Sequence, residues 1–180
     1  KDPIASKLNG VVEVDETYIG GKPRYHKDNK RGRGTKKTPV VALIERNGKS
    51  ISYPIENVSG KTLKSAIKEL VNNASTIITD EWKSYRGIGK DFAGGHRFVN
   101  HNVGEYVVDD IYTNTAESFF ALLKRGVMGV FHHISKKHLF RYCAEFSFRW
   151  DNRNVNDGER AENALMGIFG KRLAYRDCEE

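Results

Sequence analysis

The segment from Asn114 to Gly126 is predicted to be a helix that the fold must bury. Its apolar residues are Phe119, Phe120, Leu122 and Leu123. They project from more than one side of such a helix, so the helix needs neighbours around most of its circumference. Asn114 as N-cap and Glu117 three residues later match a capping box, and Gly126 stands where a helix ends. The Glu117 carboxylate therefore either caps its own helix or faces a ligand.

Residues 10–20 predict a β-strand, because β-branched residues recur there before the Gly20-Gly21 pair. Alternation puts Val12, Val14 and Glu16 on one face, and Val11, Glu13, Asp15 and Thr17 on the other. A carboxylate inside a strand is unfavourable unless it has a partner or a function. Asp15 is therefore a candidate functional residue.

The next segments predict a mixed α/β fold. Strands at residues 38–46 and 50–56 flank an Asn47-Gly48 turn, so the first three strands form an antiparallel meander. Residues 61–72 carry an apolar helical stripe and precede a short strand at residues 75–81, which we expect to run parallel to a neighbour. Asp80 ends this strand, where ligands bind in such sheets.

The remaining segments complete the predicted architecture. We expect a short strand at residues 97–101, a helix after Ser135 and a last helical piece at residues 157–175. The stripe buried by the helix after Ser135 is Leu139, Tyr142, Cys143, Phe146 and Trp150. We expect a core at residues 1–155, a helical tail at residues 156–180, and a further domain upstream, because the chain opens without a Met.

The charge of the chain favours a polyanionic partner. The formal net charge is +7, and residues 22–37 hold eight basic residues against one acid, Asp28. This segment is either a solvated hairpin loop or an arm that lies on a phosphate backbone. The two cysteines suggest a reducing compartment, and no apolar run approaches the roughly 20 residues that cross a bilayer. We expect a cytoplasmic protein.

Three acids form the candidate site: Asp15, Asp80 and Glu117. Adjacent strands and one flanking helix can bring them together, where they raise one another's pKa unless a cation neutralises them. Carboxylate oxygens suit Mg²⁺ or Mn²⁺ and argue against zinc. Two such ions about 3.5–4 Å apart can clamp the attacking and leaving oxygens of a phosphoryl transfer.

Several motifs resemble the catalytic domain of bacterial insertion-sequence transposases of the ISXO-two-like branch, across residues 10–153. They are Val12 to Lys22, Arg31-Gly32-Arg33-Gly34, Lys37 to Val41, Thr79-Asp80-Glu81-Trp82, Asn114 to Gly126, His132 to Leu139, and Arg141-Tyr142 with Glu145-Phe146. The resemblance implies an RNase H-like fold of the retroviral integrase superfamily, with a DDE-type site.

The resemblance assigns the two aspartates to Asp15 and Asp80 and the glutamate to Glu117, with Asn114 as an alternative third ligand. It implies DNA cleavage and strand transfer with Mg²⁺ or Mn²⁺, on nucleoid DNA and by a homodimer. Lys124 falls two turns after Glu117, where such enzymes contact DNA near the cut. The other expected DNA contacts are Arg125, Arg31, Arg33, Lys36 and Lys37.

Two other functions fit the same residues. One is an RNase H-fold nuclease that only hydrolyses, and the other is a nucleic-acid-binding module without turnover. Glu13, on the same strand face as Asp15, and Glu81, next to Asp80, could also approach the metals without binding them directly. The histidines 132, 133 and 138 are expected in structural or DNA-contacting roles. Tyr85 and Trp82 are expected in the core or as cover for the sheet.

Overall fold

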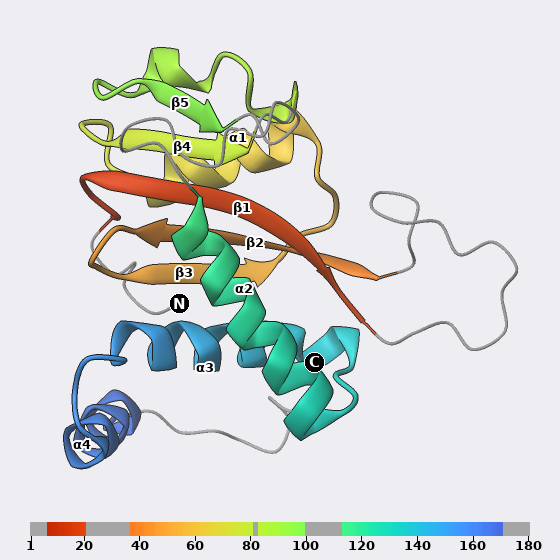
Figure 1. Cartoon of the computed structure of the whole chain (residues 1–180), viewed down its shortest axis with the longest axis vertical. Coiled ribbons are helices and arrows are strands. Elements are labelled where there is room, and N and C mark those ends of the chain that lie inside the picture. The colour runs from red at the N-terminus through yellow and green to blue at the C-terminus, as the bar shows by residue number, and fades with distance from the viewer. Residues whose placement is uncertain (1–6, 21–36, 81–82, 100–112, 171–180) are drawn as a thin grey trace, which may run out of the picture.

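The computed structural model describes residues 7–20, 37–80, 83–99 and 113–170. Five strands form one mixed sheet in the order β3-β2-β1-β4-β5 (Figure 1). The strands are β1 (Val11–Ile19), β2 (Thr38–Glu45), β3 (Ser50–Pro54), β4 (Thr76–Asp80) and β5 (His96–Val99). Their observed ends agree with the predicted ones within two residues.

The sheet combines an antiparallel meander with parallel strands. β1 pairs antiparallel with β2, and β2 with β3, whereas β4 runs parallel to both β1 and β5. Asn47 adopts a left-handed conformation (φ 59°) in the turn between β2 and β3. The crossover from β3 to β4 contains α1 (Gly60–Leu70), which starts where the Ser59 side chain accepts a hydrogen bond from the Thr62 amide. The predicted mixed sheet, an antiparallel meander joined to parallel strands, is thereby confirmed.

Helices cover both faces of the sheet. α1 lies behind it in Figure 1, while α2 (Asn114–Gly126) crosses in front and α3 (Leu139–Asp151) packs on β3. The α1-side core contains Val12, Val14, Leu63, Ile67 and Ile77. The α2-side core contains Ala42, Ile44, Phe119, Leu123 and Phe146. The predicted alternation of β1 is confirmed, because Val12 and Val14 belong to the α1 side.

The predicted bounds of α2, Asn114 and Gly126, are confirmed, but the roles predicted for these two residues need correction. Its N-cap is Thr113, which makes no side-chain capping bond, and Asn114 is the first helical residue. Gly126 does not turn the chain out of the helix, because a π-helical turn, Val127–Phe131, follows it directly. Gly126 has ordinary helical angles (φ −61°), so a left-handed helix end does not explain the glycine.

The start of α3 also differs from the prediction. Ser135 precedes a 3₁₀ turn, Lys136–His138, and its side chain makes no capping bond. The helix proper then begins at Leu139 with His138 as N-cap. The predicted stripe is confirmed: Leu139, Cys143 and Phe146 are buried, and Tyr142 and Trp150 pack partly buried against them.

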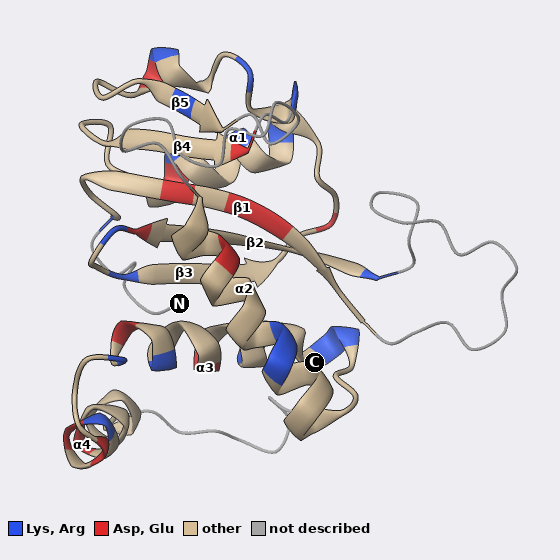
Figure 2. Ribbon diagram, viewed as in Figure 1, with Lys and Arg blue, Asp and Glu red and all other residues tan. Residues whose placement is uncertain are grey.

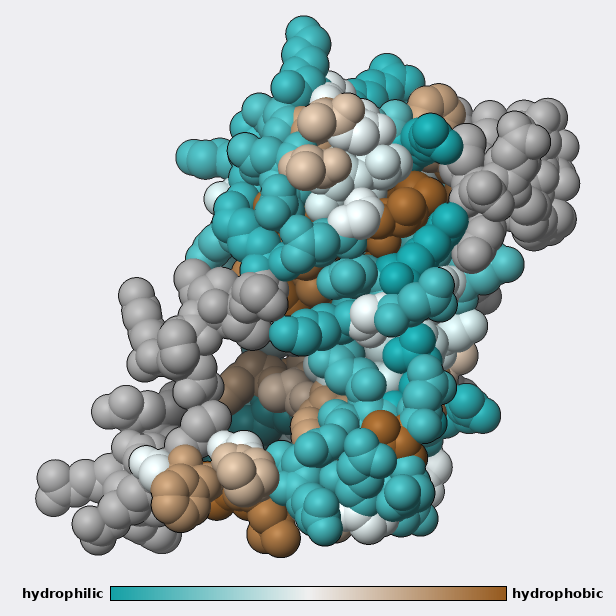
Figure 3. Space-filling view, turned by 90° about the vertical axis from the view of Figure 1, so that its left-hand side faces the viewer, coloured by the Kyte–Doolittle hydropathy of each residue, from teal (hydrophilic) through white to brown (hydrophobic). Residues whose placement is uncertain are grey.

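The last described helix, α4 (Asp157–Ile168), has no buried residue. The Asn156 side chain caps it by accepting a 2.9 Å hydrogen bond from the Glu159 amide. Hydrophobic residues gather at the lower end of the face shown in Figure 3, at the level of α4, where the exposed side chains are Leu165, Met166, Ile168 and Phe169. None of the described helices has the length and apolar content that crossing a membrane demands. The helix ends at Ile168, before the predicted end at Tyr175, and residues 171–175 lie outside the described residues.

Candidate active site

Asp15 and Asp80 lie on neighbouring parallel strands. The pairing of β1 with β4 runs from Val11 with Thr76 to Val14 with Thr79, so the next positions along the two strands are Asp15 and Asp80. Neighbouring strands are about 4.8 Å apart, and side chains at paired positions point to the same face. On the other side of β1, Asp15 pairs with Ala42, which belongs to the α2-side core. Both aspartates therefore belong to the face that α2 covers.

Glu117 approaches this face from the helix. It lies exposed in the first turn of α2, which packs on β1. In Figure 2, acidic segments of β1, the end of β4 and the upper part of α2 face the same region, and basic residues follow further down α2. Those at the end of α2 are Lys124 and Arg125, both exposed. Glu117 and Lys124 thus lie on one continuous helix, two turns apart as predicted.

The pKa of Asp15 shows that the acids influence one another. It is raised from 3.8 to about 7, first by burial and then by the charge of Glu16. The Glu16 amide opposes this by donating a 2.8 Å hydrogen bond to Asp15 Oδ1. Asp80 and Glu117 each raise the pKa of Asp15 further. Acids from β1, β4 and α2 thus share one electrostatic environment, which disfavours ionisation of Asp15 and favours a cation.

The donor chemistry of this cluster fits a hard divalent ion. Carboxylate oxygens are the ligands that Mg²⁺ and Mn²⁺ prefer, and the adjacent described residues include no cysteine ligand. Within the described ranges, however, no three His, Cys, Asp or Glu side chains are already grouped as a metal site. The fit therefore rests on the kind of donor and on the mutual repulsion of the acids.

Glu16 points to the opposite face of β1 and meets a buried tyrosine. The Tyr85 hydroxyl donates a hydrogen bond to the Glu16 carboxylate. Tyr85 is only 1% exposed, which confirms its predicted place in the core. Burial and the nearby charge of Glu16 raise the pKa of Tyr85 well above its usual range. Sequence reasoning missed this pair, because no spacing rule links residues 16 and 85.

Glu13 is the most enclosed acid of β1, with no exposed surface. Its carboxylate accepts hydrogen bonds from the Thr115 amide (2.9 Å), the Thr115 hydroxyl (2.9 Å) and the Ala116 amide (3.1 Å). The Arg46 Nε also donates to it at 2.8 Å. Glu13 thus caps α2 from a distant strand, which the predicted Asn114–Glu117 capping box did not anticipate. The sequence did contain a signal for this contact, because Glu13 lies two residues before Asp15 and therefore on the same face of β1.

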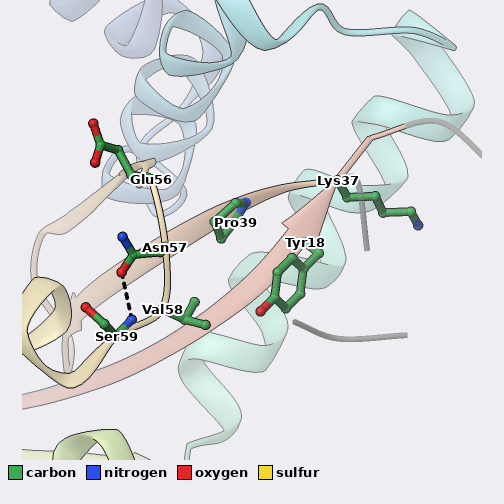
Figure 4. Close-up of a pocket in the computed structure, with 7 residues that line it drawn as sticks. All are labelled: Tyr18, Lys37, Pro39, Glu56, Asn57, Val58 and Ser59. Atoms are coloured by element: carbon green, nitrogen blue, oxygen red, sulfur yellow. Dashed lines mark hydrogen bonds between the residues drawn. The ribbon is translucent and has the colours of Figure 1, made fainter. Parts of the chain in front are cut away.

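The predicted basic contacts are only partly described. Arg31, Arg33 and Lys36 lie outside the described residues, as does Glu81. Lys37 borders a cavity of about 370 Å³ between the start of β2 and the segment after β3 (Figure 4). Its other lining residues are Tyr18, Pro39, Glu56, Asn57, Val58 and Ser59. Tyr18 packs on the α1-side core, so this cavity is separate from the acids on the α2 face.

A mixed sheet that gathers acids beneath a crossing helix is what the resemblance predicted for a transposase catalytic domain. The chain belongs to the ISXO2-like transposase domain family, which matches residues 7–151.

Two individual proteins are similar to the chain. An uncharacterized protein in transposable element ISH50 of Halobacterium salinarum is 28% identical over 155 residues, which are 79% of this chain and 52% of that protein. The chain thus spans about half the length of this curated relative. A structure described as the Mos1 transposase paired-end complex with left transposon end aligns with a TM-score of 0.34 and 13% identity, covering 81% of this chain and 54% of that one.

Proposed function

We propose that the chain is the catalytic core of a DNA transposase that cleaves transposon ends and joins them to target DNA with a divalent metal. The observation that supports this most is the register of β1 and β4, which puts Asp15 beside Asp80 on the face that α2, with Glu117 in its first turn, covers. Three elements distant in sequence therefore bring acids to one face of the sheet. Membership of the transposase family supplies the substrate class.

The metal would be Mg²⁺ or Mn²⁺, held by Asp15, Asp80 and Glu117, with Asn114 as the alternative third ligand. When bound, such ions act as Lewis acids on a phosphodiester and lower the pKa of bound water. The protein contributes position and charge. β1 and β4 fix two carboxylates on one rigid face, and α2 brings the third from above.

The basic residues would bind the DNA backbone. Lys124 and Arg125 are exposed two turns beyond Glu117 on α2, about 10 Å along the helix axis. We propose that they hold the strand near the cut, and that Lys37 and the predicted contacts Arg31, Arg33 and Lys36 bind the DNA backbone elsewhere. We further propose a homodimer acting on nucleoid DNA, a catalytic core that ends near residue 155, and an upstream domain that reads transposon ends.

The decisive test is Asp80→Asn in a cleavage and joining assay with Mg²⁺ on a DNA duplex carrying a transposon end. We expect both reactions to disappear while the DNA affinity stays within about twofold, because the basic surface is unchanged. Asp91→Asn is the matched control, since Asp91 is an exposed aspartate that pairs with Lys68 at 3.0 Å and lies outside the acidic cluster.

The products separate the competing functions. Joined strands identify a transposase, and strands that are cut but never joined identify a nuclease that only hydrolyses. A wild-type protein that binds DNA without cutting it is the non-catalytic module. Turnover by Asp80→Asn at the wild-type rate would refute the assignment of the acids.

A further inference from the structure

We propose that Glu13 is a positioning residue, which fixes the first turn of α2 on β1 and thereby holds Glu117 opposite Asp15. This inference rests on the proposed function, because it concerns how the site is assembled. The observation behind it is a fully buried carboxylate that joins the two elements carrying the candidate ligands.

The contacts of Glu13 join three elements. In the first turn of α2, the amide and hydroxyl of Thr115 and the amide of Ala116 donate hydrogen bonds to its carboxylate. Arg46, directly after β2, donates to it from the other side, and this ion pair is nearly enclosed, with the Arg46 side chain 15% exposed. Both oxygens of the Glu13 carboxylate therefore accept hydrogen bonds, and each accepts at least two.

This arrangement replaces the cap that α2 lacks locally. The first amides of a helix have no partner within the helix, and its N-cap Thr113 makes no side-chain bond to them. Glu13 supplies the acceptor, and its negative charge also suits the positive end of the helix dipole. A buried carboxylate is unfavourable without such partners. The first turn of α2 and the Glu13 carboxylate therefore satisfy each other's hydrogen-bonding groups.

The same contacts set the position of the site. Glu13 and Asp15 lie on the same face of β1, about 6.6 Å apart along the strand. Thr115 and Ala116 immediately precede Glu117. One short piece of β1 therefore carries a candidate ligand and also fixes the turn that carries another. Groups that orient metal ligands without binding the metal typically change its affinity by 10- to 100-fold.

A second carboxylate in the structure provides a matched control. Asp151, at the end of α3, accepts hydrogen bonds from the Ser50 amide (2.7 Å) and the Ser50 hydroxyl (2.8 Å). It also fastens a helix to the sheet, but at β3, on the far side of β2 from the acids. Asp151→Asn thus removes a comparable charge and helix attachment without touching α2.

The experiment compares wild-type protein, Glu13→Gln and Asp151→Asn by Mn²⁺ calorimetry without DNA at pH 8, and by amide exchange of the peptide containing residues 113–117. We expect Glu13→Gln to bind Mn²⁺ about tenfold more weakly and to exchange faster in that peptide. We expect Asp151→Asn to match the wild type in both measurements, even if its melting temperature falls as far.

Several outcomes would overturn the inference. Equal Mn²⁺ affinity in Glu13→Gln and wild type would refute the positioning role and leave the proposed function intact. Wild-type protein that neither binds Mn²⁺ nor cuts DNA would refute the proposed function, and the positioning role with it. Should Glu13→Gln fail to fold, Thr115→Val decides, because it removes only the hydroxyl donor. Unchanged affinity there would then refute the role.

Discussion

The ring of Phe146 occupies the space that a side chain at Gly126 would need. A Cβ built on Gly126 would lie 2.1 Å from Phe146 Cζ, closer than any real contact. The glycine therefore allows α2 and α3 to approach each other closely, which explains its place inside a continuing helix. The backbone at Gly126 has ordinary helical angles. The glycine is therefore required by the lack of space beside Phe146 and not by its backbone conformation.

Gly126→Ala should therefore destabilise the protein despite the better helix propensity of alanine. Alanine gains about 1 kcal/mol in a helix interior, while overpacking costs about 1–3 kcal/mol. We expect a net loss of up to about 2 kcal/mol in urea unfolding. Gly129→Ala is the control, since a Cβ at Gly129 meets nothing within 4 Å. Equal stability of the two variants would contradict this packing.

Asp15→Asn should stabilise the metal-free protein at neutral and higher pH. Because the folded-state pKa of Asp15 is about 7 and its ordinary value is 3.8, the folded protein holds a proton that the unfolded chain has lost between these values. Stability therefore falls as the pH rises from about 4 to 7, and stays low above it. We expect Asn to raise the free energy of unfolding by about 1–3 kcal/mol at pH 8, and by less at pH 5. Urea unfolding with EDTA at pH 8 and at pH 5 measures the two free energies. An equal effect of the substitution at both pH values would contradict the raised pKa of Asp15.

Metal affinity should rise with pH through the same group. A cation competes with the proton on Asp15, so below pH 7 each lower pH unit weakens binding by up to tenfold. We expect Mn²⁺ to bind roughly tenfold more tightly at pH 8 than at pH 6 in calorimetry. Asp91→Asn should follow the wild-type curve. An affinity independent of pH would show that Asp15 is not a ligand.

The third ligand can be identified by comparing Glu117→Gln with Asn114→Ala. Glu117 interacts with Asp15 electrostatically, and an anionic oxygen binds Mg²⁺ better than an amide. We expect Glu117→Gln to lower the cleavage rate by at least about 100-fold and Asn114→Ala to lower it by less than tenfold, in steady-state assays with Mg²⁺. The reverse order would assign the role to Asn114.

Periodicity predicted the sheet well because the meander and the crossover helix are local patterns. The alternation of Val12 and Val14 with Glu13 and Asp15 is fixed by the pleat, so the faces of β1 could be read from the chain itself. The grouping of Asp15, Asp80 and Glu117 is not a local pattern; it was predicted from the expected topology of two adjacent strands and one flanking helix, and the resemblance then assigned the role of each acid.

The bounds of α2 were predicted correctly, but the reasons given for its two ends were wrong, because tertiary contacts decide them. Capping rules consider neighbours in sequence, whereas the first amides of α2 bind Glu13, 102 and 103 residues away. Likewise, Gly126 matched a helix stop by composition, but its role depends on the ring of Phe146. Both errors come from contacts between distant segments, which local sequence rules do not include.

The long sequence separation between Glu13 and its partners has a consequence during synthesis. Glu13 is synthesised 102 residues before Thr115. Until then the nascent sheet lacks the donors that make this carboxylate tolerable in a protein interior. The charge of Glu13 therefore favours a hydrated, open face of the early sheet, and the arrival of α2 closes that face and brings Glu117 to the side that carries Asp15 and Asp80.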